Sequence, residues 1–72
     1  MILTMHLRHK HLSKRMDFRG TVLDLAQIIK KKYMIKDNIL SDEYSVLVDG
    51  MLAEPETKIG DTVAIIHVIS GG

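Results

Sequence analysis

The segment from Thr62 to Ile69 places the strongest constraint on what this 72-residue chain can fold into. Its apolar side chains occupy both sets of alternating positions: Val63, Ile65 and Ile69 on one side, and Ala64, Ile66 and Val68 on the other. A strand that is apolar on both faces belongs in the middle of a sheet. The chain has room for only one domain, so we expect this strand to lie at its centre.

Two further segments near the start of the chain also have the period of strands. Residues 1–8 alternate, with apolar side chains at odd positions from Leu3, and residues 12–18 alternate again after the polar residues 9–11. A period of two is typical of half-buried strands, so the pattern predicts an N-terminal hairpin.

One segment has the period of a helix. From Val22 to Tyr33 the apolar residues recur every three or four positions, which predicts one apolar stripe along a helix. Thr21 can cap its start, with Asp24 in the first turn. Lys30–Lys32 place positive charge at the negative end of the helix dipole, and we interpret them as a solvated helix end.

The second half returns to strands. Residues 35–43 predict a connecting loop, and residues 44–48 predict a short strand that stops at Asp49-Gly50, a strong hairpin signal. Residues 51–53 return as a brief strand. The predicted order is β-β-α-β-β-β, an α+β chain whose single helix packs across one face of a mixed sheet of about five strands. With the last strand beside the first and parallel to it, this is a ubiquitin-like β-grasp arrangement. We expect residues 1–69 to form the domain and residues 70–72 a flexible tail.

Composition excludes several functions. The chain has no cysteine, so it has no disulfide, thiolate metal site or cysteine nucleophile. Ten basic against nine acidic residues give a net charge of +1, which argues against a dedicated nucleic-acid binder or a polybasic membrane anchor. The longest apolar run is too short to span a bilayer, and the start of the chain predicts no secretory signal. We therefore expect a cytoplasmic domain with no membrane partner.

Few internal residues could carry chemistry. His6, His9 and His11 are close in sequence and could ligate a metal, but no nearby carboxylate completes a site. A hairpin turn in solvent explains them equally well, so we expect no metal. The loop acids Asp42, Glu43, Glu54 and Glu56 have no spacing that pairs them as acid and base. The chain is therefore not expected to be an enzyme.

The N-terminal hairpin carries a local excess of positive charge. Five basic residues face only one acidic residue, Asp17; they are Arg8, Lys10, Lys14, Arg15 and Arg19. Such an excess could contact RNA or an acidic partner. One Phe and two Tyr offer little for base stacking, so we expect no direct binding of nucleic acid.

The end of the sequence is more informative. Gly71-Gly72 follows the predicted central strand with only Ser70 between them. Glycine has no side chain to clash, so such a tail can enter a narrow channel and present the carboxylate of Gly72 there. The alternative is a frayed terminus without function.

One helix can cover only one face of the predicted sheet. On the other face Ile66 and Val68 would lie near Leu47, with Ile2, Thr4 and His6 of the first strand beside them. An exposed apolar patch of this kind often marks a partner site. Homodimerisation through the sheet, or simple tolerance of surface Ile and Val, remains an alternative.

Three segments together resemble the ThiS/MoaD family of ubiquitin-like sulfur carriers. They are Val46-Leu47-Val48-Asp49-Gly50, Gly60-Asp61-Thr62-Val63-Ala64-Ile65-Ile66 and Ile69-Ser70-Gly71-Gly72. The element order matches over the whole chain, and the specific similarity covers about its last third.

The resemblance implies a definite chemistry. An E1-like enzyme would use ATP and magnesium to adenylate the carboxylate of Gly72, while Ile69, Ser70 and Gly71 enter its channel. Sulfur from a persulfide would then displace AMP and leave a thiocarboxylate for a sulfur-accepting enzyme. The protein would be a carrier with no bound cofactor.

The branch of the family is suggested by the last residues. Small subunits of molybdopterin synthase often carry two prolines where this chain has His67-Val68. The ending Ile69–Gly72 is more similar to carriers for tRNA thiolation, some of which also modify target-protein lysines. A carrier for thiamine thiazole synthesis is a further option. The opposing hypothesis is a protein-interaction module that uses its sheet and has an idle tail.

Overall fold

The computed structural model describes residues 1–8 and 10–68, and in this part of the chain there are one helix and five strands. In chain order they are β1 (Ile2–His6), β2 (His11–Arg15), α1 (Val22–Lys32), β3 (Tyr44–Val48), β4 (Met51–Leu52) and β5 (Thr62–His67). The order β-β-α-β-β-β was predicted and is confirmed. The chain is a small α+β protein with one mixed sheet.

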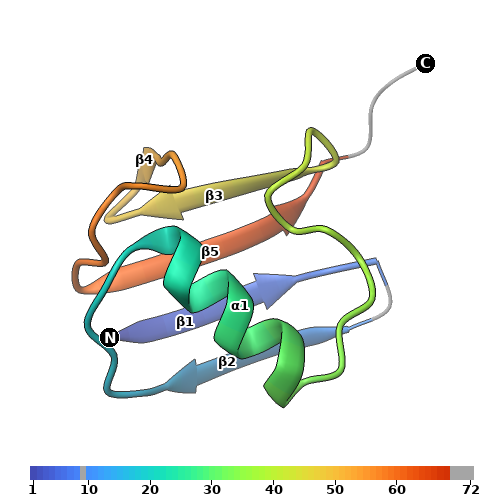
Figure 1. Ribbon diagram of the computed structural model, residues 1–72, viewed down its shortest axis with the longest axis horizontal. Helices are drawn as coiled ribbons and strands as arrows, with labels where there is room; N and C mark the ends of the chain where they lie inside the picture. Colours follow the sequence, from blue (N-terminus) through green and yellow to red (C-terminus); the bar gives the residue numbers. More distant parts are fainter. Residues whose placement is uncertain (9, 69–72) are drawn as a thin grey trace.

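The five strands form one sheet in the order β2-β1-β5-β3-β4 (Figure 1). β1 and β5 are parallel, and the other neighbouring pairs are antiparallel. The apolar segment that contains β5 therefore lies in the middle of the sheet beside the first strand, as its sequence predicts. The Asp49-Gly50 hairpin is also confirmed, with positive φ at both residues, 51° and 84°.

The core lies between the sheet and α1, which crosses in front of it in Figure 1. Its centre is formed by Leu3 and Met5 of β1 with Val63 and Ile65 of β5, all at most 2% exposed. α1 adds its predicted stripe, of which Ile29 is fully buried. Burial of such side chains contributes about 1.5–3 kcal/mol each to the free energy of unfolding.

The start of α1 is fixed by a capping box. The Thr21 hydroxyl accepts the Asp24 N–H at 3.3 Å, and Asp24 Oδ2 accepts the Thr21 N–H at 3.1 Å. These bonds satisfy backbone groups that have no partner within a helix. The cap predicted from the sequence is therefore present. In the part of the chain that the structure describes, no helix is long and apolar enough to cross a membrane.

The two strands of the N-terminal hairpin are shorter than their sequence patterns suggest. β2 ends at Arg15, although alternation continues to Phe18. The Met16 N–H still donates to the Met1 carbonyl at 2.9 Å, but the chain then turns toward α1. Edge strands are commonly short, because neighbouring chains could pair with a long one.

Candidate functional site

One face of the sheet is not covered by α1, and we call it the outer face. Side chains alternate along a strand, so the residues that flank buried positions point to this face. All five strands contribute to it: Ile2, Thr4 and His6 of β1, His11, Ser13 and Arg15 of β2, Ser45 and Leu47 of β3, Leu52 of β4, and Thr62, Ala64 and Ile66 of β5. Its middle is mainly apolar or small, and its β2 edge is polar.

The four residues predicted for a partner surface fall along the outer face. The strand register places His6 opposite Ile66 in β5, while Leu47 lies opposite Ala64, one diagonal step from Ile66. Val68 continues the alternation just beyond β5 and is 41% exposed. The arrangement thus brings together an apolar row that can contact another protein.

Two charged residues, Arg8 and Glu43, lie near the end of β5. The Val68 N–H donates to the Glu43 carbonyl at 2.8 Å, and Arg8 Nη2 lies 3.9 Å from Glu43 Oε2. Both side chains are exposed, so this ion pair contributes little to stability. Ile69, Ser70, Gly71 and Gly72, predicted to enter a partner, lie outside the described residues.

One apolar side chain on the outer face was not predicted from the sequence: Leu52 of β4 is 77% exposed and lies opposite Leu47. Ile2 of β1, which was expected on this face, is 42% exposed there. The signal for Leu52 was available in the Asp49-Gly50 turn, because pairing across a two-residue turn sets Leu52 opposite Leu47. The apolar surface therefore extends toward β4.

Two histidines meet at the β2 side of the outer face. The Nδ1 atoms of His6 and His11 are 3.0 Å apart, and their ring centres are 5.2 Å apart at an interplanar angle of 67°. Their positions in the sequence did not predict this pairing. Within residues 1–8 and 10–68, no group of three or more His, Asp or Glu side chains could hold a metal ion.

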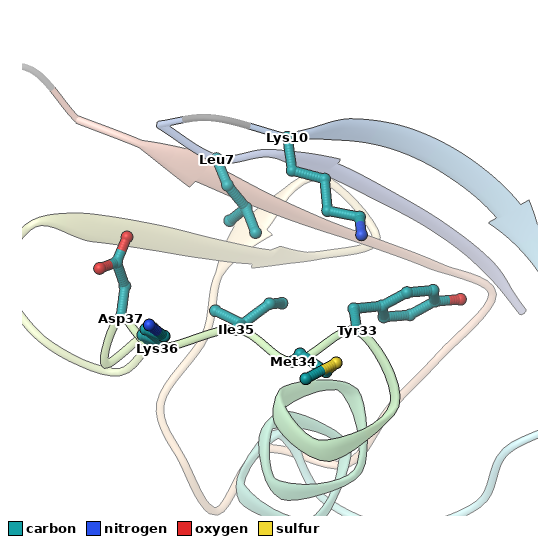
Figure 2. A pocket seen from close by; sticks show the side chains of 7 residues that line it. All are labelled: Leu7, Lys10, Tyr33, Met34, Ile35, Lys36 and Asp37. Carbon is teal, nitrogen blue, oxygen red and sulfur yellow. The ribbon is translucent and has the colours of Figure 1, made fainter.

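On the other side of the sheet a shallow hollow opens beside the end of α1 (Figure 2). Its volume is about 340 Å³, and it is lined by Leu7, Lys10, Tyr33, Met34, Ile35, Lys36 and Asp37. Lys10 points toward Tyr33, with its Nζ 5.3 Å from the ring centre (Figure 2).

The carboxylate in this hollow already has a partner. Asp37 Oδ2 accepts the Tyr44 hydroxyl at 2.6 Å. Burial, this hydrogen bond and the charge of Asp37 together raise the pKa of Tyr44 to about 12. The Asp37 carboxylate is therefore engaged within the fold.

Two of the loop acids, Glu54 and Glu56, lie close to each other. The pKa of Glu54 is raised by a side-chain hydrogen bond to Glu56 and by the charge of Glu56. Their spacing did not predict this proximity. Both side chains are exposed.

A scan against protein-family models finds no matching family, and a search of curated proteins finds no matching relative. Function is therefore inferred from the residues and their geometry.

Proposed function

We propose that this chain is a ubiquitin-like sulfur carrier with a β-grasp fold. In this proposal an E1-like enzyme adenylates the α-carboxyl group of Gly72, which is then converted to a thiocarboxylate. The proposal rests on the resemblance of the last third of the chain to the ThiS/MoaD family and on the position of β5. The chain would be the substrate of the activating enzyme, which supplies the catalytic groups.

The β-grasp assignment is supported by the order of the sheet. An N-terminal hairpin is followed by a helix across one face, and the last strand returns to the centre parallel to β1. The short β4 lies at the far edge beside β3. The chain therefore has the element order and the central parallel pair that the fold requires.

The observation that carries the proposal is the place where β5 ends. β5 is hydrogen-bonded to β1 on one side and β3 on the other, so its end is held firmly. Val68 directly precedes residues 69–72 in the sequence, and it lies beside the apolar side chains of the outer face. An activating enzyme could bind this face while the carboxyl group of Gly72 reaches the catalytic centre of that enzyme.

The chemistry follows from the properties of a carboxylate. It is ionised at neutral pH and is a poor electrophile, so attack by sulfur requires prior activation. A carboxylate oxygen of Gly72 attacks the α-phosphorus of ATP, and pyrophosphate leaves. The mixed anhydride has AMP as a good leaving group, which the terminal sulfur of a persulfide displaces to give an acyl disulfide. A second thiol then attacks the donor's sulfur and breaks the S–S bond, which releases the thiocarboxylate and leaves the two thiols joined as a disulfide. Gly71 has no side chain, so the activating channel can close around it.

Among the sulfur acceptors we favour an enzyme of tRNA thiolation. The ending Ile69–Gly72 supports this choice, and His67-Val68 weighs against a molybdopterin synthase subunit. The same activated carbonyl could be attacked by a target-protein lysine to form an isopeptide bond. That modifier role predicts conjugates in cell extracts that vanish when Gly72 is deleted.

The test is incubation of the full chain with its cognate activating enzyme, ATP, Mg²⁺, a persulfide donor and a thiol reductant. Intact mass spectrometry should detect an adenylate, and then a thiocarboxylate, at Gly72. A chain that ends at Ser70 is the matched control and should remain unmodified. Absence of both products from the full chain would contradict the proposal.

Removal of Gly71 and Gly72 also separates this function from its alternative. An interaction module that uses only the outer face would keep its full function in the shortened chain. A carrier would lose all function, although it would still fold and still bind the activating enzyme.

A further inference from the structure

The register of the N-terminal hairpin puts two histidines face to face. The Leu7 N–H donates to the Lys10 carbonyl at 2.8 Å, so these residues form a hydrogen-bonded pair. Pairs alternate along an antiparallel ladder, and the next pair, His6 and His11, is therefore of the non-hydrogen-bonded kind. Side chains approach most closely at such positions.

The two imidazoles converge through the same ring atom. Nδ1 of His6 and Nδ1 of His11 are 3.0 Å apart on the outer face, where both side chains are exposed. A hydrogen bond at this distance requires one Nδ1 to carry a proton and the other to offer its lone pair. The two atoms are thus directed at a common point between the strands.

We propose that His6 and His11 form a binding site for a divalent transition-metal ion such as Zn²⁺, with both Nδ1 atoms as ligands. Zn–N bonds of about 2.0–2.1 Å place two ligand nitrogens about 2.9 Å apart at a right angle and about 3.3 Å apart in a tetrahedron. The observed 3.0 Å lies between these values. The ion would replace the shared proton, and both Nδ1 lone pairs would then point at it.

The surroundings favour a metal that prefers nitrogen ligands. Imidazole suits Zn²⁺, Cu²⁺ and Ni²⁺, whereas Mg²⁺ and Ca²⁺ require oxygen ligands. The neighbouring pair on the outer face, Thr4 and Ser13, supplies only hydroxyl groups, 3.5 Å apart. The site therefore selects against hard cations.

Positive charges close in sequence are directed elsewhere. Lys10 lies over the ring of Tyr33 on the opposite side of the sheet, and Arg8 points toward Glu43. Neither side chain makes an observed contact with the imidazole pair. A dication between the rings thus avoids direct contact with these two charges.

Two imidazoles leave about half of a four-coordinate shell open. Water or a donor from another protein would complete it, because the pair is on the exposed outer face. His6 lies opposite Ile66, so the metal would sit at the margin of the apolar row. This inference stands whether or not the chain is a sulfur carrier.

The experiment is a titration of the full chain with Zn²⁺, followed by calorimetry and by NMR of the imidazole nitrogens. We expect one ion to bind, with the largest shifts at Nδ1 of His6 and His11. His6→Gln and His11→Gln should each weaken binding by about tenfold or more. Mg²⁺ should cause no shift.

His67→Gln is the control variant and should retain wild-type affinity, because the His67 ring lies beside that of Tyr44, away from the His6–His11 pair. Thermal unfolding of each metal-free variant checks the fold, and if one ligand variant fails to fold, the other still tests the site. The inference is overturned if Zn²⁺ leaves the His6 and His11 signals unchanged. It is also overturned if His67→Gln abolishes binding while His6→Gln does not.

Discussion

Asp49 holds the first residue of β5, Thr62, by its side chain and by its backbone. Asp49 Oδ1 accepts the Thr62 N–H at 2.9 Å, and the Asp49 N–H donates to the Thr62 carbonyl at 2.9 Å. The same Oδ1 accepts the Asp61 N–H at 2.9 Å. The turn after β3 is therefore tied to the start of the central strand, which helps to fix the register of the outer face.

Replacement of Asp49 by Gly should lower the free energy of unfolding by about 1–2 kcal/mol, because two backbone N–H groups lose a charged acceptor. Glycine also adopts the φ of 51° without strain. Relief of the backbone strain at this position would therefore offset part of the lost stability. Urea denaturation measures the change. Asp49→Asn is the matched control and should lose less, since its amide oxygen can still accept. Equal stability of wild type and Asp49→Gly would contradict this role.

Gly60 lies directly against the same carboxylate. A Cβ added at Gly60 would clash with Oδ2 of Asp49 and lie 2.8 Å from its Cγ. Gly60→Ala should therefore destabilise the protein by about 1–3 kcal/mol through steric strain. In the double variant with Asp49→Gly the clash is removed, and denaturation should show a loss smaller than the sum of the two. Simple additivity would show that the strain lies elsewhere.

Tyr44 should make stability fall at high pH. Its pKa is raised from 10.0 to about 12 by burial, by its hydrogen bond to Asp37 and by the charge of that carboxylate. The folded state therefore holds this proton more tightly than the unfolded state, and the benefit is complete below pH 10. It is lost as pH rises from 10 through 12.

The measurement is urea denaturation at several pH values between 8 and about 12. Tyr44→Phe has no phenol to ionise, so its stability should fall less steeply over this range than that of the wild type. Comparison of the two chains cancels every pH-dependent contribution that they share. Parallel curves would contradict the proposed contribution of Tyr44.

Much of the fold could be predicted because local signals agree with the final packing. Thr21 and Asp24 cap α1 through contacts only three residues apart, so sequence alone contains the motif. The alternation of Ala64 and Ile65 placed β5 in the centre, since both faces of that strand are apolar. The helix cap and the apolar strand could be predicted because they depend little on residues that are distant in the sequence.

The finer parts of the site depend on register, which a single sequence specifies weakly. A shift of one residue would exchange the partner and the face of each side chain in a strand. Proximity along the chain grouped His6, His9 and His11, but the ladder pairs His6 with His11. Leu52 is different, because the two-residue turn at Asp49-Gly50 already sets it opposite Leu47 and its place on the outer face could have been predicted.

Substitution of Ile66 tests whether the activating enzyme binds the outer face. Ile66→Asp places a charge in the middle of the apolar row, and it should reduce the rate of Gly72 adenylation by about tenfold or more at limiting concentrations. ATP–pyrophosphate exchange measures this rate. The side chain is only half-buried on the far side from α1, so the fold should survive.

The matched control is Ile28→Asp, which makes the same chemical change at a residue of α1 that is 43% exposed. α1 packs on the opposite side of the sheet, so its variant should be adenylated at the wild-type rate. Urea denaturation of both variants separates lost binding from lost folding. If both variants are adenylated at the wild-type rate, the activating enzyme does not bind the outer face. If only Ile28→Asp is adenylated slowly, the activating enzyme binds the exposed side of α1 instead.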